Sequence, residues 1–170
     1  MDICDVFDII WLETSFASSV REKLAASPVM NEKILSRLEA GHELAEIEEE
    51  VAHKKGLALF FGGKVVGCVR NGHEVDDCLF AYVLLENIAC KAGGVLSLLH
   101  LLKNTGMAPE EVDFVIECSE EGAGDMNQRA GANFAKAIAE IAGCVTASGC
   151  EVRSFCAGPV NAMMAGASQV

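Results

Sequence analysis

The sequence has little positive charge, and this shortage limits its partners. Thirteen Lys and Arg stand against 25 Asp and Glu, so the 170-residue chain carries a formal net charge of −12. Because nucleic acids are bound largely through Lys and Arg, and no basic cluster occurs, neither nucleic acid nor an anionic membrane is an expected partner. The acidic N-terminus lacks the basic region of a signal peptide. The longest uncharged stretch, 154–170, is shorter than the roughly 20 apolar residues of a membrane span. We therefore expect a cytoplasmic protein.

Apolar residues are plentiful, and cysteine is unusually common. Hydrophobic residues make up 51% of the chain, which excludes disorder and supplies a core for about one domain. The eight cysteines are scattered through apolar periodic segments and form no C-x-x-C pair. Most are therefore expected to be small core residues, and neither a metal centre nor a cofactor is predicted.

The pattern along the chain predicts a helical segment, 1–55, followed by an α/β region, 56–170. Apolar residues recur at helical spacing in 20–26, 31–39 and 43–53, and Gly41 is expected to end the second of these helices. From Gly56 the pattern becomes extended. Leu57 to Phe61 and Lys64 to Val69 flank Gly62-Gly63, which is typical of a β-hairpin with a two-residue turn.

Helices and apolar strands alternate after the hairpin. A long helix is expected from a cap at Asp76 or Asp77 to about Lys103, with an interruption at Gly93-Gly94. Strands are expected over 114–118 and 151–155, and helices over 129–141 and 160–170. Apolar strands separated by helices favour a parallel sheet with helices on both faces, a three-layer α/β/α architecture.

Cys156 is the main candidate site residue, because it lies where the last strand is expected to end and the last helix to begin. Ligands of α/β proteins bind beside the carboxyl ends of strands, and the positive end of a helix dipole favours a thiolate. Such a thiolate can attack and hold an acyl group, and the small residues Ala157 and Gly158 would let a carbonyl substrate approach the backbone. Two other interpretations are open: a structural thiol placed there by chance, or a redox sensor with Cys118 as the resolving thiol.

Acidic residues gather after the strand at 114–118, namely Glu117, Glu120, Glu121 and Asp125. They either line a cleft or are simply solvated. Asp125 and Arg129 are the substrate-binding candidates in this part of the chain. No G-x-x-x-x-G-K-[ST] motif occurs, so nothing supports nucleotide hydrolysis.

Several stretches resemble component C, the beta subunit, of glycine/sarcosine/betaine reductase complexes. They are VLSLLHLLKNTGMAPEEVDFVIECSEE (95–121), VDFVIECSEEGAGDMNQRAGANFAKAIAEIAG (112–143) and EVRSFCAGPVNAMMAGA (151–167), with ILSRLEAGHELAEIE (34–48) and GKVVGCV (63–69) upstream. That family is similar in turn to the β-ketoacyl-acyl carrier protein synthase III branch of the thiolase superfamily. Those enzymes carry a cysteine where a strand meets a buried helix, and Cys156 matches that position.

The resemblance implies a role in acyl transfer in anaerobic amino-acid metabolism. Component C of this family, with a second subunit resembling phosphate acyltransferases, takes the two-carbon unit from carboxymethylated selenoprotein A and releases acetyl phosphate through an acetyl thioester. Those two proteins are the implied partners. Either Cys156 or a cysteine of the second subunit carries the acetyl group. A noncatalytic scaffold that orders this partner, or a synthase III-like acyltransferase, is the alternative function.

The resemblance also implies that the chain is a thiolase-like half-domain, a fragment that is inactive in isolation. Thiolase folds comprise two similar halves, and the second supplies the catalytic His and a further Asn or His. The aromatic-proline pair that synthase III enzymes place before the helix matching 129–141 is absent. An isolated half would leave apolar faces exposed, in keeping with a mean hydropathy of +0.30. We therefore expect a homo-oligomer or hetero-oligomer.

Overall fold

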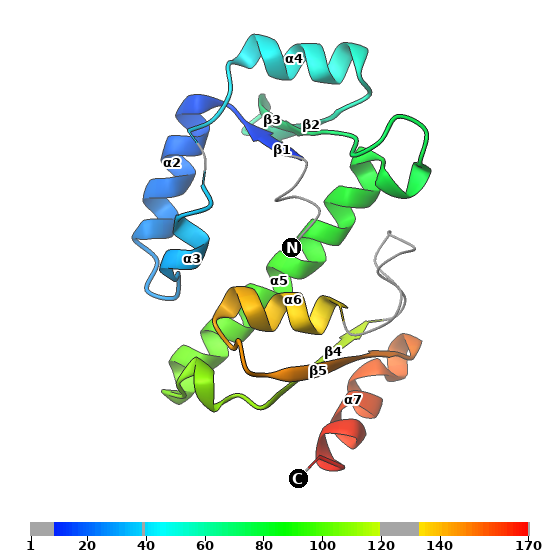
Figure 1. Cartoon of the computed structure of the whole chain (residues 1–170). Helices are drawn as coiled ribbons and strands as arrows, with labels where there is room; N and C mark the ends of the chain where they lie inside the picture. Colours follow the sequence, from blue (N-terminus) through cyan, green and yellow to red (C-terminus); the bar gives the residue numbers. More distant parts are fainter. Residues whose placement is uncertain (1–8, 39, 120–132, 170) are drawn as a thin grey trace. The chain divides into compact units, whose positions relative to one another are not determined.

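The computed structural model describes residues 9–38, 40–119 and 133–169. The chain forms two compact units, Met1–Glu86 and Asn87–Val170. Helix α5 (Ala81–Thr105), drawn in green in Figure 1, passes from the first unit into the second. Each unit is described by itself below. The division predicted from the sequence, 1–55 and 56–170, stays a prediction.

An antiparallel sheet with the strand order β1-β3-β2 forms the first unit's centre. The predicted hairpin is confirmed, because β2 (Leu57–Phe61) and β3 (Lys64–Val69) have the expected bounds. Its turn residues Gly62 and Gly63 have φ values of 57° and 78°, which glycine adopts without the steric penalty of other residues. Strand β1 (Ile10–Leu12) was not predicted; it pairs with β3 and makes β3 the central strand.

Three helices accompany this sheet, with bounds that differ from the predicted ones at their ends. Helix α2 (Thr14–Ala25) begins before residue 20, because the Glu13 carboxylate accepts the N–H groups of Ser15 and Phe16. Together with the Ser15 hydroxyl, these hydrogen bonds hold the pKa of Glu13 below its usual value. Helix α3 (Glu32–Leu35) ends well before Gly41, whereas α4 (Leu44–His53) agrees with the prediction.

A buried carboxylate on α4 is paired with two cations. Glu50 is only 3% exposed; its Oε1 lies 2.7 Å from Lys54 Nζ and its Oε2 lies 3.3 Å from Arg70 Nε. Burial favours a raised pKa for Glu50, but hydrogen bonding and charge from Lys54 and Arg70 outweigh it and leave the pKa below its ordinary value. The Arg70 guanidinium also lies over the Trp11 ring, 4.3 Å from its centroid, and Trp11 stacks on His42.

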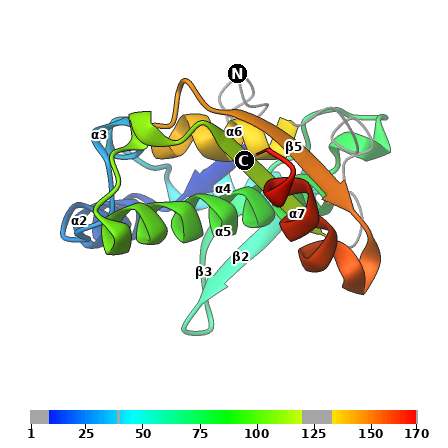
Figure 2. The same cartoon turned by 90° about the horizontal axis from the view of Figure 1, so that it is seen from below.

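The second unit contains a parallel pair of strands, β4 (Phe114–Ser119) and β5 (Ser148–Arg153). Helix α6 (Asn133–Ala142) contacts both strands, as does α7 (Gly158–Ala167). Figures 1 and 2 together show α6 on one face of the pair and α7 on the other. The predicted parallel strands between helices are confirmed at this level. The last strand and helix both end earlier than predicted, at Arg153 and Ala167.

Helix α5 corrects two predictions. It continues through Gly93 and Gly94, where an interruption was expected. Its first N–H group, on Ala81, donates to Asn71 Oδ1 at 2.7 Å, so Asn71 caps the helix. Asp76 instead caps a short 3-10 turn, Asp77–Leu79, that precedes α5. The cap of α5 is therefore a side chain ten residues earlier in the chain, whereas the sequence pattern predicted a cap at Asp76 or Asp77.

Helix α5 is also the one helix in the described parts of the chain that is long and apolar enough to cross a membrane. It has 25 residues, and its most apolar window has a mean hydropathy of 1.3. Core helices of soluble proteins meet the same two criteria. Length and composition therefore assign no membrane to this chain.

Replacing Gly93 and Gly94 separately with Ala should change stability in opposite directions. No atom beyond the helix's own backbone lies within 4 Å of a Cβ at Gly93, so Gly93→Ala should stabilise by up to about 1 kcal/mol through helix propensity. A Cβ at Gly94 would be 3.0 Å from Ile138 Cγ1 and closer still to Cδ1, so Gly94→Ala should destabilise by about 1–2 kcal/mol. Urea denaturation of both variants checks this, and equal shifts in the same direction would contradict the packing of α5 on α6.

Candidate functional site

The carboxyl ends of β4 and β5 lie side by side, with Ser119 opposite Arg153. The chain then passes from β5 through a short 3-10 turn, Phe155–Ala157, directly into α7. Cys156 is in this turn and is exposed. The thiol therefore occupies the predicted position, between the carboxyl end of a strand and the amino end of a helix.

The turn that carries Cys156 has a strained backbone. Phe155 has a φ of 44°, which is uncommon for a bulky residue, and its side chain is 71% exposed. Two hydrogen bonds hold the turn. Ala157 N–H donates to the Ser154 carbonyl at 2.9 Å, and Asn161 Nδ2 donates to Ser154 Oγ at 2.5 Å. Ser154 thus fixes the turn to α7.

The other predicted site residues divide into two groups. Ala157 and Gly158 adjoin Cys156 on the same turn; Ala157 is exposed and Gly158 is buried. A Cβ at Gly158 would lie 3.6 Å from the Ser119 carbonyl oxygen and 3.7 Å from Cys118 Cβ, so this glycine packs against the end of β4. Asp125 and Arg129 lie outside the described residues. The functional roles of all of these residues stay predictions.

A group of partly and fully buried residues, most of them charged, lies at the same ends of β4 and β5, and among them only Glu117 was considered for a site from the sequence. Arg153 pairs with Glu151, at 3.0 Å between Nη2 and Oε2, and its Nη1 pairs with Glu117. Glu151 also accepts the N–H of Phe134, in the first turn of α6. We call the following residues the Phe134 cluster: Asn87, Lys91, Glu117, Phe134, Glu151 and Arg153. The sequence signal was the presence of charged residues, Glu117, Glu151 and Arg153, within two predicted core strands.

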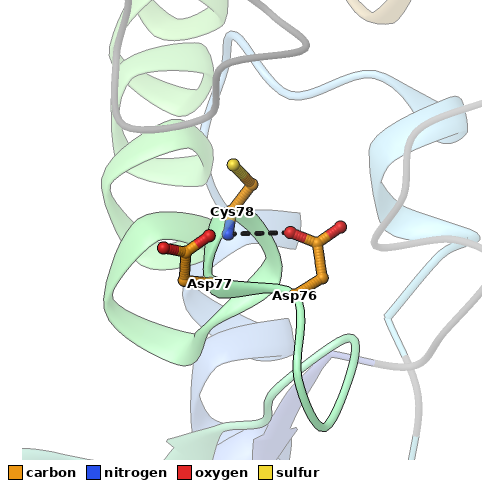
Figure 3. A group of neighbouring side chains, drawn as sticks. All are labelled: Asp76, Asp77 and Cys78. Carbon is orange, nitrogen blue, oxygen red and sulfur yellow. Dashed lines mark hydrogen bonds between the residues drawn. The ribbon is translucent and has the colours of Figure 1, made fainter.

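Three neighbouring side chains of the first unit offer possible metal ligands. Donor atoms of Asp76, Asp77 and Cys78 all lie within 4.8 Å of one another. Figure 3 shows that Asp76 already accepts the backbone N–H of Cys78, at 3.0 Å, as the cap of the 3-10 turn. The sequence pattern predicted only a helix-capping role for the two aspartates. The local geometry is explained by capping, without a metal ion.

The first unit also has an open pocket of about 190 Å³. Its lining is largely apolar, and Lys55 is its one ionisable cation. Lys55 and Tyr82 are the lining residues with ionisable side chains, and no cysteine, histidine or carboxylate lines the pocket. The lining residues are Lys55, Gly56, Leu57, Asn71, Phe80, Ala81 and Tyr82.

The described residues thus define an α/β protein with an exposed cysteine at the carboxyl edge of a parallel strand pair. Over all 170 residues, the chain is 48% identical to the glycine/sarcosine/betaine reductase complex component C subunit beta of Peptoclostridium acidaminophilum, so the similarity extends over the whole of this chain. It spans 33% of that protein's length. No protein-family model and no solved structure matches the chain. The predicted resemblance to component C is confirmed, and the thiolase-like architecture stays a prediction.

Proposed function

We propose that this chain takes part in acetyl-thioester transfer within a glycine/sarcosine/betaine reductase complex, as a thiolase-like α/β half-domain of a component C beta-type subunit. One observation carries the proposal: in a chain 48% identical to that subunit, an exposed cysteine occupies the β5–α7 turn. A nucleophile in that position is reached by an acyl donor from solvent. It also lies at the positive end of a helix dipole.

In the proposed reaction, the Cys156 thiolate attacks the carbonyl carbon of an activated acyl compound, namely a thioester or an acyl phosphate. A bond forms between Sγ and that carbon, and the bond to the leaving group breaks. The leaving group departs with the bonding electron pair and takes up a proton. The positive end of α7 and its backbone N–H groups favour both the thiolate and the negative oxygen of the intermediate. Attack by phosphate on the thioester, in the partner subunit, would then yield acetyl phosphate and restore the thiolate.

The proposed partners are a second component C subunit resembling phosphate acyltransferases and carboxymethylated selenoprotein A, in the cytoplasm. Exposed apolar side chains on and just before α7 support assembly with another protein. Phe155, Val160, Met163 and Met164 are each more than half exposed. Such side chains on one short segment are typical of a surface that is covered in a complex. They equally favour the alternative function, a scaffold that orders the acyl-carrying partner without catalysis.

Alkylation by iodoacetamide distinguishes the proposal that Cys156 is a nucleophile from the alternative that the chain is a noncatalytic scaffold. We expect Cys156 to react at least about tenfold faster than Cys90 at pH 7, because Cys156 lies in an exposed turn at the amino end of α7. Cys90 is the matched control, since it is also exposed but lies within α5. Cys144 should be the slowest, because burial and the nearby Glu110 raise the pKa of its thiol. Peptide mass spectrometry measures each rate.

The outcome decides between the two functions. If Cys156 and Cys90 react at the same rate, the proposal that Cys156 is the nucleophile is wrong and the scaffold function is favoured. A fast Cys156 should also accept an acetyl group from acetyl phosphate in the assembled complex, seen as a 42-dalton adduct on its peptide.

A further inference from the structure

The buried stripe of α5 in the second unit changes from polar to apolar along its length. Its positions follow helical spacing: Asn87, Lys91, Val95, Leu99 and Leu102. The last three are apolar, as expected for a helix face in a core. The first two are polar, yet Asn87 is only 5% exposed and Lys91 only 6%. Asparagine and lysine side chains are seldom so buried unless their polar atoms are hydrogen-bonded or paired with an opposite charge.

The polar end of the stripe lies at the carboxyl ends of the parallel strands. Lys91 Nζ is 5.3 Å from the centroid of the Phe134 ring, and the guanidinium carbon of Arg153 is 6.0 Å from the same centroid. Asn87 precedes Lys91 by one turn on the same face of α5. The polar residues are thus concentrated beside the edge where α/β proteins bind their ligands.

Two donors of the Phe134 cluster lack an acceptor. Asn87 Nδ2 and Arg153 Nε are both inaccessible to solvent, and neither has a hydrogen-bond partner among residues 9–38, 40–119 and 133–169. A buried donor without an acceptor destabilises a fold more than an apolar group in its place. Both carboxylates of the cluster are engaged, since Glu117 and Glu151 pair with Arg153.

The charges of the cluster indicate what kind of acceptor is missing. Among the described residues, the cluster holds two carboxylates, Glu117 and Glu151, and two cationic side chains. A further anion would leave an excess negative charge in a buried site, which is unfavourable. A neutral oxygen, such as a carbonyl oxygen, satisfies both donors without adding charge.

We propose that the Phe134 cluster binds the carbonyl oxygen of a small acyl compound through Asn87 Nδ2 and Arg153 Nε. The choice of an acyl compound rests on the proposed function, whereas the unpartnered donors are independent of it. Cys156 lies three residues beyond Arg153, at the same strand ends. The cluster and the thiol would therefore serve the same ligand, one holding the acyl oxygen and the other taking the acyl group.

The test uses the full chain with Cys156→Ser, so that binding is measured without transfer. The probe is the thioester S-acetyl-N-acetylcysteamine, titrated by NMR. We expect Asn87→Leu to weaken binding at least tenfold, because it removes one of the two donors. The same substitution should raise the melting temperature of the ligand-free protein by about 2–8 °C, because it removes an unpartnered buried donor. Asn104→Leu, on the exposed end of α5, is the matched control and should leave binding unchanged.

Three results would overturn the proposal: no binding of the probe to the Cys156→Ser protein, unchanged affinity in Asn87→Leu, or a lower ligand-free melting temperature in a folded Asn87→Leu variant. The last would mean that the protein itself supplies the acceptor. If Asn87→Leu does not fold, the binding test is done with Asn87→Ala, which should also weaken binding of the probe at least tenfold. If Asn87→Leu loses binding and Cys156 is unreactive in the native chain, the proposed acyl transfer is wrong. The proposed acyl-binding site is then still supported.

Discussion

Gly67→Ala should destabilise the first unit by about 3 kcal/mol or more, because the added methyl group has no space. Gly67 is buried in the central strand β3, opposite Leu12 of β1. A Cβ there would overlap the carbonyl oxygen of Trp11 and lie 3.2 Å from Leu12 Cα. Both obstacles are backbone atoms of a paired strand, so they move only if β1 separates from β3.

Urea denaturation followed by tryptophan fluorescence measures this effect directly. Trp11 is the single tryptophan of the chain and belongs to β1, so its emission reports on the strand that Gly67→Ala displaces. Gly63→Ala is the control: it changes a glycine in the turn next to the same strand, where no atom lies within 4 Å of an added Cβ but φ is 78°. That variant should lose only about 1 kcal/mol. Equal losses in the two variants would show that the β1–β3 contact does not limit residue size at Gly67.

Glu50→Gln should remove about 2–3 kcal/mol of stability at pH 7 and alter the response to acid. The substitution keeps the shape of the side chain but leaves the Arg70 guanidinium without its buried counter-charge. Lys54 is exposed and contributes little of this loss, since water screens its charge.

The direction of the acid effect follows from the pKa of Glu50. Its pKa is lower in the folded protein than the ordinary value of 4.5. The stabilisation from its ionised form is therefore present above pH 4.5 and is lost as the pH falls through the lower, folded value. We expect the advantage of the wild type over Glu50→Gln to shrink in that range.

Denaturation of both proteins between pH 7 and pH 3 tests the expectation. Glu46→Gln is the control, since Glu46 is an exposed acid of the same helix and should change stability by less than about 0.5 kcal/mol. A stability difference between wild type and Glu50→Gln that is constant over the whole range would contradict the ionised pair.

Elements fixed by local signals were predictable from the sequence. The hairpin follows from Gly62-Gly63, and α4 from its apolar spacing, because both depend on residues close in sequence. Strand β1 has only three residues and exists through pairing with distant β3, which no local pattern records. Likewise, α5 continues through Gly93-Gly94 because packing of Ile138 onto Gly94 offsets the low helix propensity of glycine.

The candidate site was predictable in position but not in composition. A strand followed by small residues and Pro159 located Cys156 between β5 and α7. The Phe134 cluster was not foreseen, because it brings side chains from α5, β4, α6 and β5 together. Their charges, taken one at a time in the sequence, look like those of solvated residues. Only the tertiary fold shows that Asn87 and Lys91 are buried.

The connections in the two sheets differ in length, and this difference has a kinetic consequence. Strands β2 and β3 are joined by two residues, so they pair on the timescale of hairpin formation, about 1–10 µs. Strands β4 and β5 are separated by a much longer segment that includes α6, and closing this longer loop slows their association. During synthesis the first unit leaves the ribosome earlier and folds sooner. Before β5 has been synthesised, β4 lacks its partner strand, and unpaired strand edges favour aggregation of the nascent chain.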